Sequence, residues 1–429
     1  MKKIFIIRDT LANKISYYHL LLFLVCLPFD RFYTELILIS FSIHTLLHIK
    51  RNPIACLQLK KVLLLQAVFL LSVACLFYAY DKSDGFNKPG RQSAILLFPI
   101  LFSLTRLDLE KYKLQLFSGF ALTCTLIIAY LYFDALHTIF FNKLALSELF
   151  SPAFINHNFS EPIEMHATYL SMYACFSLVY MVYLLLKTKE IIYKVFYFFC
   201  CLILTAGLIQ LGSKAVLIAA IVAVNLIMPM LISVTKKRAL YLSVSITASL
   251  VVIIGITTGP IFKTRYLTGF KEDLHGLGFG PSIPEPRMAR WESAVKLINR
   301  SPIIGYGTGA EVPVLKQQYY RDKLYIAYYD ELNAHNEYLS IALNSGYTGL
   351  LLFLFVLYAG FTIAYKKKDV LCMSFLIIII ITSFSENILD LNKGIFFYSF
   401  FFSLFLLSNN KSRLTYVSNK EAVAQATFQ

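Results

Sequence analysis

Apolar runs of about twenty residues recur along nearly the whole chain, and short polar segments separate them. Hydrophobic residues make up 58% of the 429 residues, and charged residues make up only 15%. Lipid offers the backbone no hydrogen-bond partners, so a spanning segment must be a helix or part of a closed barrel. The runs are continuous rather than alternating, which favours helices. The sequence therefore predicts an all-α polytopic membrane protein.

The runs predict about twelve transmembrane helices. The predicted spans lie near 16–29, 33–49, 62–80, 92–104, 114–133, 166–186, 194–211, 214–234, 240–258, 335–365, 370–386 and 394–408. Residues 1–258 then hold nine spans, residues 259–334 form one large loop, residues 335–408 hold three spans, and residues 409–429 form a tail. Basic residues precede the first span, but no small-residue cleavage site follows it, so we expect this span to be retained.

The distribution of positive charge predicts the orientation in the membrane. The formal net charge of +15 is concentrated in short loops, at 50–61, 106–113, 187–194, 236–238 and 366–368. Such loops face the cytoplasm in membrane proteins. We therefore expect cytoplasmic N- and C-termini and an outward-facing loop 259–334, and the charge does not indicate nucleic acid as a partner. The eight cysteines lie in apolar or cytoplasmic segments, so we expect no disulfides.

Within the large loop, "PEPRMARWESAVKLINRSP" predicts an amphipathic helix, with Pro286 in its first turn and Pro302 beyond its end. Arg287 and Arg290 lie one turn apart. One interpretation is a helix on the membrane surface whose arginines contact lipid headgroups. The other is that the arginines bind an anionic ligand. The apolar stripe of this helix comprises Met288, Trp291, Val295 and Ile298.

The glycine-rich stretches "HGLGFGP" and "IIGYGTG" do not fit a dinucleotide fingerprint, because no strand precedes them and no acidic residue follows at the required distance. We interpret them as turns that allow close approach of the backbone. The spacing of His157, Glu161, Glu164 and His166 matches no zinc motif, so no metal site is predicted.

Ionisable residues are absent near the midplane of the ninth to twelfth predicted spans, and polar residues gather at the outer ends. Ion-coupled transport usually requires buried ionisable groups within the spans. The sequence therefore favours an outward-facing interfacial site over a path through the membrane.

Lys214 follows a tight hairpin, "IQLGSKAVLIA", which predicts that it begins the eighth transmembrane helix at its outer end. A lysine at a helix N-terminus opposes the helix dipole. Two interpretations remain open: a bound anion compensates this charge, or the lysine side chain extends to the headgroup region.

The stretch "NAHNEYLSIALNSGYTG" begins the tenth predicted span, which runs from His335 to Tyr365. This span is longer than a hydrocarbon core of about 30 Å requires, so its first turns should project outward. At a helix N-terminus the dipole disfavours imidazolium, and free backbone N–H groups favour phosphate. The alternative is that Asn333 caps the helix and His335 is an ordinary interfacial residue.

Three motifs together resemble the O-antigen ligase and polymerase superfamily of bacterial envelope proteins: "AHNEYLSIALNSGYTGLLLFL", "GSKA", and R-x-x-x-W followed by "SPIIGYGTG". The resemblance runs from about Ser171 to the twelfth span. It implies a multi-pass protein of the bacterial inner (cytoplasmic) membrane, with one large periplasmic loop containing amphipathic helices. It also implies an active site on the periplasmic face.

The implied activity is that of a glycosyltransferase in lipopolysaccharide biosynthesis. The donor would be an undecaprenyl-diphosphate-linked glycan, and the acceptor a sugar hydroxyl of lipid A–core or another glycan. The expected reaction inverts the anomeric carbon and needs no cofactor or metal. Membrane lipids would surround the protein, and nucleic acid is not an expected partner.

The resemblance also implies roles for particular residues. His335 matches the motif histidine, a base or hydroxyl-orienting group, and Arg287 matches an arginine that holds the donor diphosphate. Lys214 stands where the family usually has arginine, and it offers a point charge instead of a bidentate fork. Arg290 is a further candidate for the diphosphate. Weaker candidates are Arg91, His166, Asn336 and Glu386.

Two alternatives to a ligase remain. A polymerase that joins repeat units would use the same donor and much the same site, with another lipid-linked glycan as acceptor. A transporter of lipid-linked glycans belongs to a different class, and it predicts that His335 and Arg287 are not needed for glycan transfer.

Overall fold

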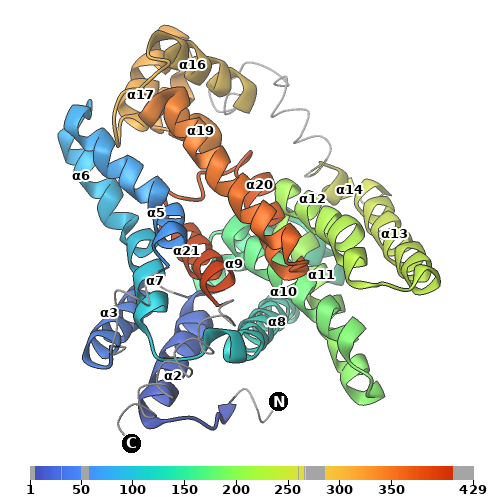
Figure 1. Ribbon diagram of the computed structural model, residues 1–429. Helices are drawn as coiled ribbons and strands as arrows, with labels where there is room; N and C mark the ends of the chain where they lie inside the picture. Colours follow the sequence, from blue (N-terminus) through green and yellow to red (C-terminus); the bar gives the residue numbers. More distant parts are fainter. Residues whose placement is uncertain are drawn as a thin grey trace, which may run out of the picture.

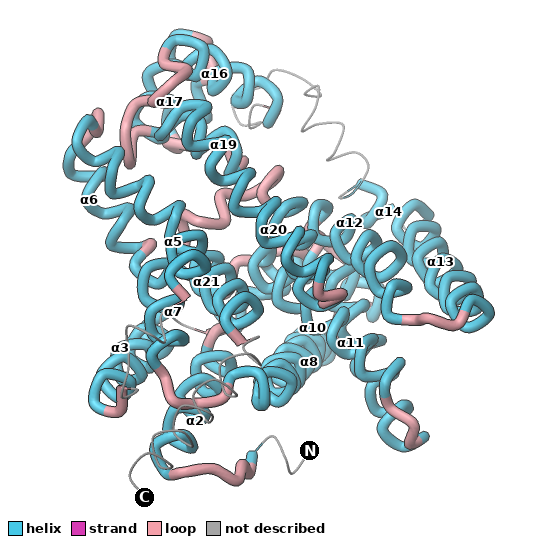
Figure 2. The backbone as a smooth tube through the Cα atoms, viewed as in Figure 1, coloured by secondary structure: helices cyan, strands magenta, loops and turns pink. Residues whose placement is uncertain are grey.

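The computed structural model describes residues 5–29, 31–49, 58–258, 260–264, 266 and 286–408. Within these residues the regular structure is helical, as Figure 2 shows, which confirms the all-α prediction. The predicted tail 409–429 and the glycines of "HGLGFGP" lie outside the described residues.

Each predicted span overlaps a helix. These helices are α2 (Leu11–Cys26), α3 (Arg31–Leu47), α5 (Leu59–Ala74), α7 (Ser93–Leu104), α8 (Leu109–Phe141), α10 (Ala167–Lys187), α11 (Ile191–Leu211), α12 (Lys214–Val222), α13 (Thr235–Thr258), α19 (Glu337–Lys366), α20 (Val370–Thr382) and α21 (Asn392–Leu407). Judged by length and composition alone, seven helices in the described part of the chain could cross a membrane. Four other apolar helices are shorter, with 10–17 residues each.

Helix α21 lies at the centre of the bundle, as Figure 1 shows. Every residue from Gly394 to Leu407 is buried, as expected for a helix that is apolar on all sides. Its phenylalanines pack against aromatic rings of the surrounding helices. Phe401 lies 4.7 Å from Phe176 of α10 and 5.9 Å from Phe375 of α20 between ring centroids. Edge-to-face and stacked aromatic pairs of this kind add to the stability from apolar burial.

A helical cap stands at one end of the bundle (Figure 1). It comprises residues 286–334 with helices α16 (Arg287–Arg300), α17 (Glu311–Arg321) and α18 (Tyr325–Tyr329). The predicted helix after Pro286 is thus confirmed, but its buried face is rotated from the predicted stripe. Ile298 is buried, whereas Val295 is 43% exposed. The apolar core of the cap includes Ala294, Leu297, Ile298, Val314, Leu315 and Tyr319.

Helix α19 begins at Glu337, two residues later than predicted, and it is kinked at Gly346 (φ 65°, ψ −169°). The kink frees backbone carbonyls, and the loop 301–309 of the cap supplies donors for them. Tyr306 N donates to Leu343 O (2.9 Å), and Gly307 N donates to Asn344 O (2.8 Å). The break in the helix is therefore stabilised by hydrogen bonds that replace the lost ones.

The same loop 301–309 also contacts the end of α5. Thr308 Oγ1 donates to Ser72 O (2.5 Å), and Tyr80 N donates to Tyr306 O (3.0 Å). Gly305, Gly307 and Gly309 all have positive φ, so the predicted glycine turns are confirmed. A Cβ atom at Gly307 would come 2.4 Å from Ala79 Cα, which explains the need for glycine there.

Candidate functional site

A cavity of about 320 Å³ lies where the cap meets the ends of several membrane helices. Helix α6 (Lys82–Arg91), the start of α10, the start of α17, the segment before α19 and the α20–α21 loop all contribute to its lining. Four of the candidate residues from the sequence come together here. They are Arg91, His166, His335 and Glu386.

His335 lies just before α19, not at its first helical position. Asn336 is the N-cap, and its side chain accepts a hydrogen bond from Leu339 N (3.2 Å). The predicted cap, Asn333, instead accepts a hydrogen bond from His335 N through Oδ1 (3.0 Å). This turn holds His335 in left-handed backbone, with φ of 47°. Asn336 is buried, and its backbone N–H donates to Asn387 Oδ1 (2.7 Å), so it supports the segment beneath His335.

Glu386 is the ionisable partner of His335. His335 Nδ1 lies 3.5 Å from Glu386 Oε2, and the other carboxylate oxygen accepts a hydrogen bond from Thr168 Oγ1 (3.2 Å). The His335 side chain is 31% exposed, and that of Glu386 only 12%. A proton on Nδ1 facing a carboxylate leaves the lone pair on Nε2 available. The pair can therefore accept a proton from a hydroxyl in the cavity.

The surroundings of Glu386 favour its ionised form. Burial alone would raise the pKa of this carboxyl, but the hydrogen bond from His335 and the nearby positive charges lower the pKa below its usual value. His166 and Arg287 contribute to this effect together with His335. His166 is also the N-cap of α10, where Nδ1 accepts a hydrogen bond from Thr168 N (3.3 Å).

The two arginines of α16 have different surroundings. Arg287, the first residue of the helix, donates from Nη1 to Ser385 O (3.3 Å), next to Glu386. Arg290 is only 6% exposed, and its Nη1 lies 3.5 Å from Asn333 O. Trp291 Nε1 donates to Ala334 O (2.8 Å). Arg290 therefore does not lie on the membrane surface, as one interpretation of the sequence held, but packs inside the protein behind the segment that carries His335.

Lys214 begins α12, as predicted. Gly212, with φ of 64°, ends α11 and makes the hairpin as tight as the sequence indicates. The cavity lining does not include Lys214, Arg287 or Arg290. The contact of Arg287 with the Ser385 carbonyl connects it to the site through the α20–α21 loop.

The structure adds a buried charged cluster that the sequence reasoning missed. Lys88 Nζ lies 2.7 Å from Asp390 Oδ1, and both side chains are largely buried. Asn387 Nδ2 donates to both oxygens of Glu311 (3.0 Å each) and to Asp390 Oδ2 (3.1 Å). Glu311 also accepts a hydrogen bond from Ala334 N (3.0 Å), next to His335. The cluster thereby fixes the backbone that carries the histidine.

Electrostatic complementarity holds this cluster together. Burial lowers the pKa of the Lys88 ammonium group, but the carboxylates of Asp390, Glu311 and Glu337 outweigh burial and raise the pKa above its usual value. Burial raises the pKa of Glu311, with a further contribution from Asp390. Lys88, Asp390 and Glu311 come from three distant parts of the chain, so no local pattern in the sequence indicates their contact.

The cavity lining carries both signs of charge. Lys88 and Arg91 are cationic, whereas Glu311, Glu386 and Asp390 are acidic. His335 with Glu386 provides a proton acceptor there. Among the described residues, no group of three or more His, Cys, Asp or Glu side chains is arranged to hold a metal ion.

Comparison with protein families gives a match to part of the chain. Residues 197–354 match the family model described as O-Antigen ligase. The matched segment contains Lys214, Arg287 and His335, and it extends past the kink in α19. A search of the curated proteins finds no match.

Proposed function

Because residues 197–354 match the family model described as O-Antigen ligase, we propose that the chain is a glycosyltransferase that moves a glycan from undecaprenyl diphosphate to a sugar hydroxyl of lipid A–core. In this proposal the protein spans the bacterial inner membrane with both termini in the cytoplasm, and the cap and the cavity face the periplasm.

The observation that carries the proposal is the pairing of His335 with Glu386 at the cavity. The acceptor hydroxyl oxygen attacks the anomeric carbon and forms the new glycosidic bond. The bond between that carbon and the phosphate oxygen breaks, and undecaprenyl diphosphate leaves with the electron pair. The hydroxyl proton passes to Nε2 of His335, while Glu386 stabilises the imidazolium. A single displacement inverts the anomeric carbon.

Positive side chains would stabilise the charge that develops on the departing diphosphate. We assign Arg287 to this role, with Lys214 as a second contact, and both lie in the segment that matches the family. Arg91 adds positive charge to the cavity lining, whereas the charge of Lys88 is balanced by Asp390. We assign Arg290 a positioning role instead, because it contacts the carbonyl of Asn333, two residues before His335.

A transfer assay with the purified full-length chain in proteoliposomes tests the proposal. With donor and defined lipid acceptor supplied and no metal added, His335→Ala and Arg287→Ala should each lower kcat by about a hundredfold or more. His137→Ala on α8 and Arg300→Ala at the end of α16 are matched controls, because neither residue lines the cavity and, unlike Arg287, neither is hydrogen-bonded to the α20–α21 loop. Undiminished transfer in the folded His335→Ala and Arg287→Ala variants would favour a transporter and overturn the proposal.

Complementation separates the ligase from a polymerase. In a strain that lacks its own ligase, the proposal expects capped lipopolysaccharide. If the chain instead restores long glycan ladders in a polymerase mutant and caps no lipopolysaccharide, the assigned acceptor is wrong, although the proposed transfer from a lipid-linked donor stands.

A further inference from the structure

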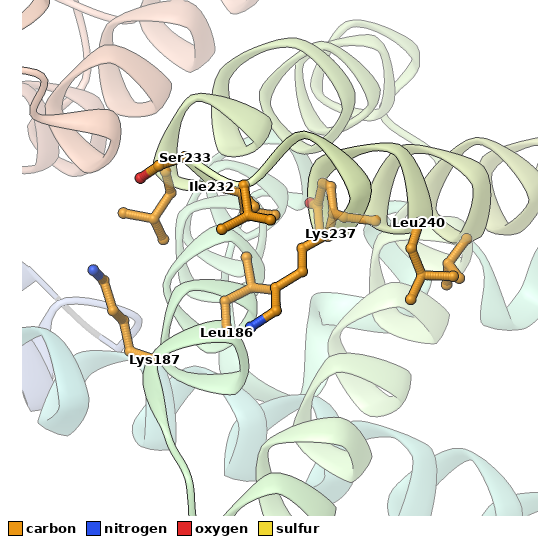
Figure 3. A pocket seen from close by; sticks show the side chains of 10 residues that line it. Leu186, Lys187, Ile232, Ser233, Lys237 and Leu240 are labelled. Carbon is orange, nitrogen blue, oxygen red and sulfur yellow. The ribbon is translucent and has the colours of Figure 1, made fainter.

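A second cavity, an apolar groove of about 440 Å³, lies at the other end of α10 (Figure 3). His166, the N-cap of α10, lines the first cavity, whereas Leu186 and Lys187, in its last turn, line the groove. The 21 residues of α10 span about 31 Å at 1.5 Å per residue. That length matches a hydrocarbon core of about 30 Å, so the two cavities lie near opposite faces of the membrane.

The walls of the groove are predominantly apolar. They include Leu186, Ile232, Val234, Leu240, Tyr241 and Val244. Leu240 is 67% exposed and Val244 is 63% exposed, so this part of α13 offers an uncovered apolar surface next to the groove. In a membrane helix such a surface faces acyl chains.

Positive charge gathers at the same groove from two separate segments. Lys187 ends α10, and Lys237 lies in the first turn of α13. Figure 3 shows the Lys187 side chain reaching toward Ser233 and the Lys237 side chain reaching toward Leu186. Neither lysine forms an ion pair with another described residue.

The start of α13 adds to this positive potential. Its first turn contains Lys236, Lys237 and Arg238 and no acidic residue. The N-terminal end of a long helix is itself the positive end of the helix dipole. The side chains and the dipole therefore repel one another here, and an anion in the groove would relieve that repulsion.

We propose that this groove binds an anionic glycerophospholipid. Its phosphate lies between the ammonium groups of Lys187 and Lys237, and one acyl chain lies along the apolar wall formed by Leu240 and Val244. A lipid satisfies both features of the groove, whereas a free phosphate ion would leave the apolar wall exposed. The proposal concerns the membrane face opposite His335 and does not depend on the reaction proposed there.

Native mass spectrometry of the full-length chain, released from nanodiscs of phosphatidylcholine with a minor fraction of phosphatidylglycerol, tests this site. We expect the wild-type chain to retain phosphatidylglycerol in preference to phosphatidylcholine. The double variant Lys187→Gln with Lys237→Gln should bind phosphatidylglycerol at least about tenfold more weakly, because it removes both cations that attract the anionic headgroup.

The double variant Lys189→Gln with Lys236→Gln is the matched control, since it removes the same charge from the same two segments outside the groove. A third variant, Val244→Trp, fills the apolar wall without changing charge, and it should also lose the lipid. Equal loss in the two lysine variants would indicate general attraction to the membrane surface and overturn the proposal. Retention of the lipid by Val244→Trp, or complete displacement by inorganic phosphate, would overturn the role of the acyl chain.

Discussion

At the scale of single residues, the backbone of His335 is unusual. It is a non-glycine residue with positive φ, a conformation that costs free energy unless its surroundings impose it. Three contacts hold the segment: Asn333 Oδ1 on the His335 N–H, Arg290 on the Asn333 carbonyl, and Trp291 on the Ala334 carbonyl. These side-chain contacts hold the backbone of His335 next to Glu386, directly before the N-cap of α19.

The carboxyl of Glu386 predicts a pH dependence of stability. Its pKa is lower in the folded protein than the ordinary value of 4.5. Its ionised form therefore contributes stability above about pH 4.5, and this contribution is lost as the pH falls through the lower, folded pKa. We expect wild type to melt higher than Glu386→Gln at neutral pH. That difference should shrink below about pH 4.5, when melting temperatures of both proteins are compared across pH in detergent. A difference that grows toward acid pH would contradict the lowered pKa.

At the scale of elements, the kink in α19 explains why the loop 301–309 is rich in glycine. A Cβ atom at Gly346 would lie 2.2 Å from Ile303 O, and the φ of 65° disfavours any other residue. The helix break and the loop that covers it therefore require each other, and together they place Asn344 on the cavity lining.

Replacing this glycine should destabilise the protein. We expect Gly346→Ala to lower the free energy of unfolding by about 2 kcal/mol or more. The new methyl group would clash with backbone atoms, and alanine is strained in this backbone conformation. Gly255→Ala in α13 is the control, since nothing lies within 4 Å of a Cβ atom there. Chemical denaturation in mixed micelles measures the free energy of unfolding of both variants. Equal free energies of unfolding for the two variants would mean that α19 can straighten at residue 346 without loss of stability.

The helices themselves were predictable, whereas the kink was not. Runs of apolar residues specify α10, α13 and α21 regardless of their neighbours, because lipid requires the backbone to be hydrogen-bonded within each segment. A single glycine in a long apolar helix is usually tolerated, so the presence of Gly346 in the sequence was not enough to predict a kink. The carbonyls freed at the kink are bound by residues about forty positions earlier, and no local pattern encodes that contact.

At the scale of the whole molecule, the candidate site is only partly visible in the sequence. His335, Arg287 and Lys214 were identified through motifs that are contiguous in the chain. Lys88 and Asp390 meet only because α6 and the α20–α21 loop are brought together at the same end of the bundle. Their pairing depends on helix assembly, so local spacing could not predict it.

The buried pair makes a prediction about assembly. Removing Lys88 leaves the carboxylates of Asp390 and Glu311 without their cation. Lys88→Met should therefore lower the free energy of unfolding by about 3–5 kcal/mol. Adding Asp390→Leu should restore part of that loss, because it removes one of the unpaired charges. Lys82→Met on the exposed part of the same helix is the control. Unfolding free energies of wild type, Lys88→Met, Asp390→Leu and the double variant test the coupling, and additive effects of the two substitutions would argue against a direct pair.

The central position of α21 has a consequence for biosynthesis. This helix follows all the other described helices in the chain, yet the surrounding helices pack their aromatic side chains against it. The ribosome therefore delivers the middle of the bundle after the helices that surround it. Those earlier helices leave an unfilled space between them in the bilayer until α21 has been inserted.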